Sequence, residues 1–204
     1  MKLRALLLSA SAGLALAGMG AATAASAQQA GDFTFGVGLG LVTPKDDNGT
    51  LSAGDLTLGD DTQITLTLEY LLTDNLGLEL LAATPFTHDI KLNGAKVGEV
   101  EHLPPTVTLN YYFRNDSKFT PFVGAGVNFT TALDVDSPLG DLDLQDSWGL
   151  AAHLGLDYAL SENNALRTDL RWMDIDMDTS LNGAGLGTAE VDPLVLGVSF
   201  VHRF

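Results

Sequence analysis

The sequence contains no cysteine among its 204 residues, so neither disulfides nor thiolate chemistry can contribute to its fold or function. Basic residues are also scarce, with 10 Lys and Arg against 26 Asp and Glu and a formal net charge of −16. Because neutralising phosphates requires clustered cations, this balance excludes nucleic acid as a partner. Beyond residue 27 no apolar run approaches the ~20 residues of a membrane-spanning helix, and no segment shows the period of a core helix. The chain is therefore expected to be built from strands.

The first 27 residues have the pattern of a secretory signal peptide. Lys2 and Arg4 give a basic start, residues 5–18 form a short apolar run, and Ala25-Ser-Ala27 is a small-x-small cleavage site. We expect cleavage after Ala27, which leaves residues 28–204 as the mature chain. Loss of the two cations takes the formal charge from −16 to −18.

The last eleven residues alternate with a period of two, which is the period of a β-strand. The bulky residues are Leu194, Leu196, Val198, Phe200, His202 and Phe204, and between them lie Val195, Gly197, Ser199, Val201 and Arg203. The last strand of a soluble sandwich could share this alternation. A chain that ends on an aromatic after such an apolar run is more typical of an outer-membrane barrel, whose last strand closes against the first.

Seven further segments show the same alternation, at residues 32–43, 63–73, 76–90, 102–113, 118–131, 147–160 and 165–176. In each, one face is large and apolar, while the other holds Gly, Thr and charged residues that suit a narrow lumen. Short connections at 74–75, 114–117 and 161–164 alternate with long ones at 44–62, 91–101, 133–146 and 177–190. This arrangement predicts an all-β protein, an eight-stranded antiparallel transmembrane β-barrel of the outer membrane, with short periplasmic turns and long extracellular loops.

Aromatic residues gather near the predicted strand ends, where interfacial belts of a membrane barrel would lie. They are Phe33, Tyr70, Phe86, Tyr111, Phe113, Phe119, Phe129, Trp148, Tyr158, Trp172 and Phe204.

Charged residues on the small faces would point into the lumen. They are Glu69, Glu79, His153, Asp157, Arg167, Asp169, Arg171 and Arg203. Unpaired buried charge is costly, so we expect these groups to pair across the lumen. They would form either a salt-bridged plug or a polar selectivity element along a channel. The plug is favoured because an eight-stranded interior is just wide enough for side chains to fill it.

No catalytic or metal-binding motif is evident. His88, His102 and His153 lie on different segments without HxxH or HExxH spacing, and neither Ser147 nor Ser199 has a GxSxG context. We expect no enzyme activity, no cofactor and no metal site. The Asp residues that crowd the long connections predict a solvated acidic rim, bridged by divalent cations to outer-membrane lipids and lipopolysaccharide.

Three stretches carry a resemblance: Glu79-Leu-Leu-Ala-Ala-Thr-Pro-Phe86, His102-Leu-Pro-Pro105 and Trp172-Met-Asp-Ile-Asp176. In combination and order they resemble the OmpW family of small outer-membrane proteins, over essentially the whole mature chain. The resemblance implies a narrow channel for uptake or efflux of small hydrophobic molecules. It also leaves open a closed structural or surface-recognition barrel that is linked to stress and serves as a receptor for phage or bacteriocins.

The resemblance also implies roles for particular residues. Leu81 would help to constrict the channel, and Arg171 occupies the facing position, where some relatives carry an aromatic residue. Pro104 and Pro105 would open the barrel wall laterally toward the outer leaflet. Oligomeric state is not indicated by any of these features.

Overall fold

The computed structural model describes residues 28–204, and the predicted signal peptide at residues 1–27 lies outside them. The described chain is all-β. Its strands are β1 (Phe33–Thr43), β2 (Thr50–Leu51), β3 (Gly54–Leu58), β4 (Asp61–Leu71), β5 (Leu76–Ala83), β6 (Phe86–Leu92), β7 (Ala95–Leu103), β8 (Thr106–Tyr112), β9 (Phe119–Asp136), β10 (Leu142–Leu144), β11 (Ser147–Ala159), β12 (Asn164–Met173), β13 (Asp176–Leu181), β14 (Ala184–Glu190) and β15 (Leu194–Arg203). Over residues 28–204, no helix is long and apolar enough to span a membrane.

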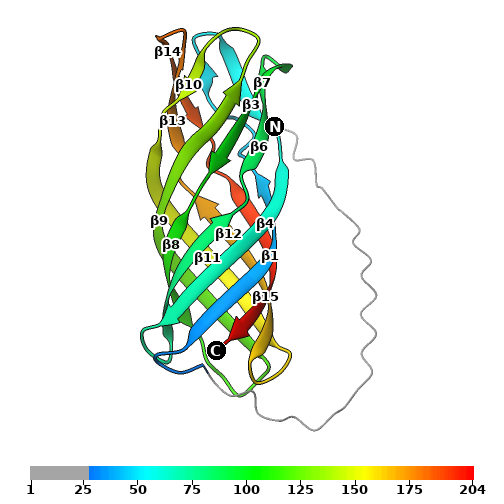
Figure 1. The fold of residues 1–204 in the computed structure, drawn as a ribbon, viewed down its shortest axis with the longest axis vertical. Coiled ribbons are helices and arrows are strands. Elements are labelled where there is room, and N and C mark those ends of the chain that lie inside the picture. The colour runs from blue at the N-terminus through cyan, green and yellow to red at the C-terminus, as the bar shows by residue number, and fades with distance from the viewer. Residues whose placement is uncertain (1–27) are drawn as a thin grey trace, which may run out of the picture.

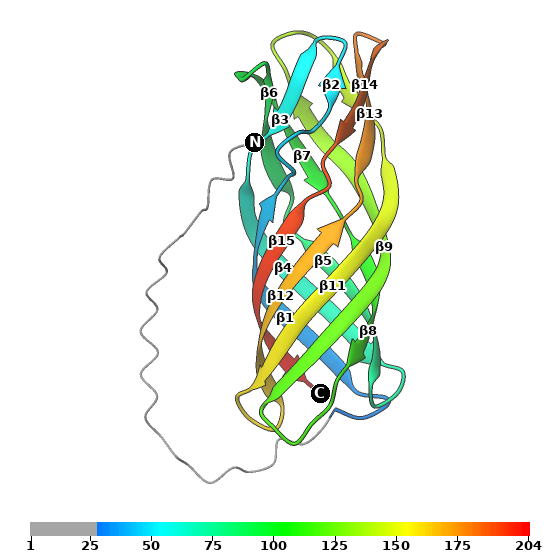
Figure 2. The same ribbon diagram turned by 180° about the vertical axis from the view of Figure 1, so that it is seen from behind.

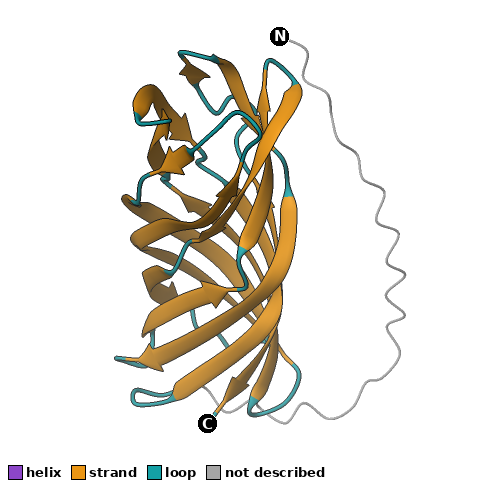
Figure 3. Cartoon of the chain, turned by 45° about the horizontal axis from the view of Figure 1, so that its top comes forward, coloured by secondary structure: helices purple, strands orange, loops and turns teal. Residues whose placement is uncertain are grey.

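Eight antiparallel strands close into a barrel, as predicted. Their order is β1-β4-β5-β8-β9-β11-β12-β15, and β15 returns to pair with β1 through contacts such as Gly40↔Gly197 (Figures 1 and 2). Short connections join the strands at one end, called here the turn end. At the other end the remaining strands continue the wall upward as an extension (Figure 3).

The outward face of the barrel is apolar. Along β15, Leu196 is 55% exposed and Val198 49%, whereas the neighbouring Val195 is only 5% exposed. The same alternation runs around the other barrel strands. A continuous exposed band of Leu, Val and Phe is the signature of a surface that faces acyl chains.

Aromatic side chains flank this band. At the turn end Phe33 packs against Tyr70 with ring centroids 4.8 Å apart, and near the extension Phe129 packs against Trp148, also at 4.8 Å. The prediction for Phe86 was wrong, because its side chain is 3% exposed and faces the interior. The predicted single strand is interrupted at Thr84 and Pro85, which separates β5 from β6 and shifts the alternation.

The long connections were expected to be loops, but much of them is strand. β6 and β7 form a hairpin closed by Asn93-Gly94, and β13 and β14 form one closed by Asn182-Gly183. In both turns Asn and Gly have positive φ, 50° and 82° in the first and 52° and 79° in the second. Two successive residues with positive φ make the turn that matches strand twist, and Asn-Gly is its preferred sequence.

Candidate functional site

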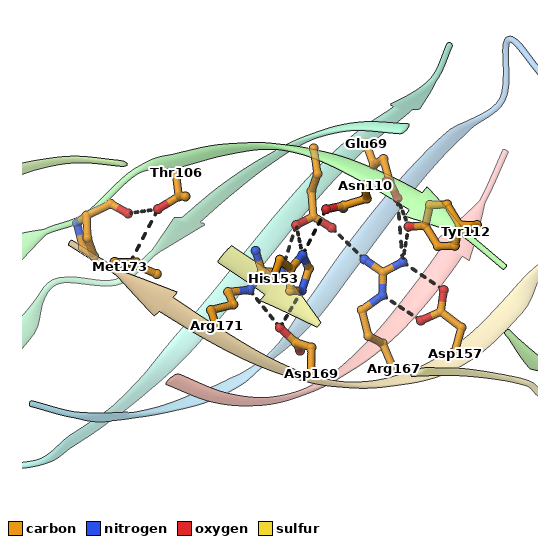
Figure 4. Close-up of polar contacts among 12 residues, drawn as sticks. Glu69, Thr106, Asn110, Tyr112, His153, Asp157, Arg167, Asp169, Arg171 and Met173 are labelled. Carbon is orange, nitrogen blue, oxygen red and sulfur yellow. Dashed lines mark hydrogen bonds and ion pairs between the residues drawn. The ribbon is translucent and has the colours of Figure 1, made fainter. Parts of the chain in front are cut away.

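A cluster of charged side chains fills the lumen toward the turn end, and Arg167 on β12 lies at its centre (Figure 4). Its Nη1 lies 2.6 Å from Glu79 Oε2, its Nε lies 2.7 Å from Asp157 Oδ1, and its Nη2 donates to Tyr112 Oη at 2.7 Å. The guanidinium carbon is 4.5 Å from the centroid of the Phe122 ring. Arg167 is only 1% exposed, so a full cation is buried among these partners.

Arg171 extends the cluster by one inward-facing position. It reaches Glu79 Oε1 at 2.9 Å through Nη2 and Asp169 Oδ2 at 2.8 Å through Nε. The His153 ring contacts the same Asp169 oxygen at 3.0 Å through Nε2, and Asn110 Oδ1 at 3.2 Å through Nδ1. Glu79 therefore bridges the two guanidinium groups, and the cluster is one connected network.

The predicted lumen network comes together with one exception. Glu69 joins it by accepting hydrogen bonds from Tyr112 Oη at 2.6 Å and Asn110 Nδ2 at 3.2 Å. Arg203 lies at the turn end, where its Nε is 3.6 Å from Asp32 Oδ2. Tyr112 and Asn110 were not predicted as members, although the alternation of their strand points both inward.

These residues fill the lumen at this level. The carboxylates, guanidinium groups, His153, Tyr112 and Phe122 are all buried. Four carboxylates and two guanidinium groups pack here with aromatic rings, and none of these residues is more than 8% exposed. The geometry favours the plug over a polar channel lining, and this cluster is called the plug below.

Glycines make room for the plug. A Cβ built at Gly155 would lie 2.3 Å from Phe122 Cζ and 3.1 Å from Asp169 Cβ. We predict that Gly155→Ala lowers the free energy of unfolding by about 1–3 kcal/mol, the usual range for overpacking a filled interior. Gly185→Ala is the matched control, because a Cβ there meets nothing within 4 Å. Urea unfolding of both variants in lipid vesicles measures the difference, and equal stability of the two would contradict the packing argument.

An apolar layer covers the plug on its extension side. Leu81 faces inward, as predicted, and packs in one hydrophobic cluster with Met173, Ile175 and Val195. Arg171, expected to face Leu81, instead lies one inward position nearer the turn end, in the plug. Polar side chains border this layer, because the buried Thr106 and Asn128 lie 3.7 Å and 3.6 Å from Met173 Sδ through Oγ1 and Nδ2.

Above this layer the extension encloses an apolar cavity, called the vestibule below. It is lined by aliphatic side chains of β2, β3, β6, β7, β10, β13 and β14, and Ser137 and Thr179 are the polar members of the lining. Among the lining residues there is no charged and no aromatic side chain. Such a cavity offers hydrophobic contact but almost no hydrogen bond.

The barrel wall is interrupted beside Leu81. The ladder between β5 and β8 stops at Leu81↔Thr106, and pairing resumes between β6 and β7 at Phe86↔His102. Residues 82–85 and 103–105 are unpaired with each other, and Pro104 and Pro105 lack the N–H that a ladder needs. This interruption is called the wall gap below. A small cavity lined by Leu81, Phe86, His102, Pro104 and others lies immediately inside it.

Acidic groups cluster at the outer rim of the barrel. Carboxylate oxygens of Asp174, Asp176 and Asp192 lie within 4.8 Å of one another. Lys45 pairs with Asp192 at 2.9 Å and with Glu190. Partial burial and the neighbouring carboxylates Asp192 and Asp174 raise the pKa of Asp176. The Lys45 ammonium already supplies a counter-charge, which suits the solvated rim that the sequence predicted.

An apolar band with aromatic flanks, a closed eight-stranded ladder and a side-chain-filled interior together define an integral β-barrel of the bacterial outer membrane. Residues 29–204 match the OmpW family, and the chain belongs to that family. It is 39% identical to outer membrane protein W of Escherichia coli over 88% of this chain and 92% of that protein. The crystal structure of the outer membrane protein OprG from Pseudomonas aeruginosa superposes with a TM-score of 0.78 at 36% identity, covering 87% of this chain and 97% of that one. A more distant relative, 25% identical over 74% of this chain and 75% of its own length, is the dibenzothiophene metabolism operon protein PahQ of Pseudomonas aeruginosa.

Proposed function

We propose that the barrel passes small hydrophobic molecules across the outermost part of the outer membrane, between the vestibule and the wall gap. In barrels of this kind the short turns are periplasmic and the long connections extracellular, so the vestibule faces outward. A solute would enter it from outside, reach the apolar layer at Leu81, and leave sideways at Pro104 and Pro105 into the outer leaflet. The reverse direction, efflux, uses the same path.

The observation that carries this proposal is where the apolar interior ends. Above Leu81 the vestibule lining is almost entirely aliphatic, with the buried imidazoles of His88 and His102 near the wall gap. Below Leu81 lies the plug, centred on Arg167 and Glu79. Entry of a hydrophobic solute into the buried ionic network is unfavourable, because it would separate the paired charges. The wall gap lies level with the boundary between the two zones, so the sideways route avoids the plug.

The relatives are consistent with a hydrophobic cargo. The name of PahQ links that relative to metabolism of dibenzothiophene, a fused aromatic compound with little capacity to hydrogen-bond. The vestibule of this chain has the matching chemistry. Its aliphatic lining selects by size and apolar surface rather than by directed contacts.

The plug also favours a second candidate, a closed barrel whose exposed extension recognises a partner at the cell surface. In that case the wall gap would be a structural irregularity at a proline pair. The two functions differ in one measurable property, the passage of a hydrophobic solute.

Replacing both prolines at the wall gap separates these candidates. Val at positions 104 and 105 restores two N–H groups and high strand propensity, so the ladder can close. We predict that cells producing the Pro104→Val/Pro105→Val variant take up the fluorescent probe N-phenylnaphthylamine at nearly the rate of cells without the protein, while the unchanged barrel accelerates uptake several-fold. Pro138→Val, at an exposed site in the extension, should leave uptake unchanged. Equal uptake with and without the unchanged barrel would support the closed surface-recognition protein instead.

A further inference from the structure

Two histidines face each other inside the barrel at the base of the extension. His88 on β6 and His102 on β7 are diagonal neighbours, because Phe86 pairs with His102 and His88 with Val100. Their ring centroids lie 4.9 Å apart with an interplanar angle of 36°. His88 is 0% exposed and His102 3%, so both imidazoles are withdrawn from solvent.

Most of the hydrogen-bonding capacity of this pair is unused. His88 Nδ1 lies 2.6 Å from the carbonyl oxygen of Gly59, so Nδ1 carries the proton and donates it. His88 Nε2 and both ring nitrogens of His102 have no hydrogen-bond partner among residues 28–204. An unsatisfied buried polar group is expensive, and three of them side by side call for a ligand.

The protonation state leaves one ring nitrogen of each histidine available as a ligand. Burial lowers the pKa of both imidazoles, and that of His102 to about 3, so both rings are neutral at neutral pH. A neutral imidazole that donates Nδ1–H to a backbone carbonyl presents the Nε2 lone pair to a metal ion. His88 has this arrangement, and His102 lies beside it with two unused nitrogens.

The surroundings suit a divalent cation. The charges of Asp61 and Asp60 act on His88, and that of Asp61 also acts on His102, so two carboxylates give the site a negative potential. Phe86 stacks near both rings, with centroids 6.4 Å and 6.0 Å away, and shields one side. The small cavity at the wall gap includes His102 in its lining, so this ring borders open space inside the barrel.

We propose that His88 and His102 form a two-histidine site for a nitrogen-preferring first-row transition-metal ion, with Zn²⁺ as the representative. Imidazole ligands suit Zn²⁺, Cu²⁺ and Ni²⁺, whereas Mg²⁺ and Ca²⁺ require oxygen ligands. The bound ion would tie β6 to β7 at Phe86↔His102, the first pair beyond the wall gap. The metal would thereby stiffen the upper edge of the gap. From the sequence we expected no metal site, because the two histidines are fourteen positions apart on different segments.

Calorimetric titration of the mature barrel in detergent with Zn²⁺, and separately with Mg²⁺, tests the proposal. We expect one equivalent of Zn²⁺ to bind and Mg²⁺ to give no signal. His88→Gln/His102→Gln should abolish Zn²⁺ binding, and His202→Asn, which removes a histidine of the last strand, should retain it. Absence of Zn²⁺ binding to the unchanged barrel, or equal binding by the double variant, overturns the proposal.

Two further measurements keep the test independent of folding and of transport. Nitrogen NMR of the ring atoms should show a large Zn²⁺-dependent shift at His88 Nε2 and none at His202. Hydrogen exchange should show that Zn²⁺ slows exchange of the β6 and β7 amides in the unchanged barrel alone. Both readouts can be measured even if the barrel takes up no solute. Ring-nitrogen shifts that do not change on addition of Zn²⁺ would overturn the proposed metal site.

Discussion

Replacing Arg167 with methionine should lower the free energy of unfolding by about 3–5 kcal/mol, the cost of leaving buried charges without their partner. Methionine keeps an unbranched apolar stem of similar reach but removes the cation. Glu79 and Asp157 then lose contacts at 2.6 Å and 2.7 Å, while both carboxylates stay buried. The loss arises from uncompensated negative charge rather than from a missing attraction alone.

Urea unfolding in lipid vesicles, followed by the fluorescence of Trp148 and Trp172, measures this effect. Both tryptophans lie on the lipid-facing side of β11 and β12, so their emission reports the transfer from lipid to water. Lys118→Met removes the same formal charge at an exposed position of the turn end and should change stability by less than about 0.5 kcal/mol.

A second substitution identifies the cause. Asp157→Asn in the Arg167→Met background removes one of the stranded carboxylates, so the double variant should regain part of the lost stability. Two results would argue against the plug as described: an Arg167→Met barrel as stable as the Lys118→Met barrel, or a double variant that is less stable still.

The inward and outward faces of the barrel were predictable because lipid-facing and lumen-facing residues alternate strictly along a regular strand. Arg167 and Asp169 were placed inward on this basis, and both side chains are buried in the lumen. Pairing between the charges also followed, since an eight-stranded interior forces inward side chains into contact. The alternation placed Tyr112 inward as well, and its role in the plug could have been inferred from its hydroxyl group.

Two kinds of feature could not be obtained from alternation. A break in a strand shifts the period, so Phe86 was assigned to the lipid face when the interruption at Thr84 and Pro85 turns it inward. Contacts between strands depend on register, which fixes whether His88 lies beside His102 or a strand's length away. The hairpins of the extension form an intermediate case, because Asn93-Gly94 is a strong local turn signal within a segment that was expected to be a loop.

Acidification should loosen the extension before the barrel. The His88 and His102 side chains lie on β6 and β7, above the lipid-facing band, and are kept neutral by burial. An unfolded histidine has a pKa of about 6.5, whereas the pKa of His102 in the folded protein is about 3. Between these values the unfolded segment binds more protons than the folded one. The free energy of unfolding therefore has its full value above about pH 6.5 and declines as the pH falls.

The size of the effect follows from the same values. At pH 5 the free energy of unfolding of this segment is lower by about 2 kcal/mol because of His102, since each pH unit below the unfolded pKa costs about 1.4 kcal/mol. His88 adds to this loss, because a second imidazolium would lie 4.9 Å away. Asp61 opposes part of this loss, because its carboxylate, which accepts hydrogen bonds from Gln63 and from the backbone of Thr62 and Thr87, would attract an imidazolium.

Hydrogen exchange with a metal chelator present, corrected for intrinsic rates, tests this directly. Going from pH 7.5 to pH 5 should speed exchange in β6 and β7 by roughly 10-fold or more, while β12 and β15 remain protected. His88→Gln/His102→Gln should remove the pH dependence, and His202→Asn should keep it. Equal exchange of β6 and β7 at both pH values in the unchanged barrel would mean that the imidazoles have hydrogen-bond partners that stabilise their charged form. That result would contradict the acid response. It would also contradict the metal site, which requires free lone pairs on the same rings.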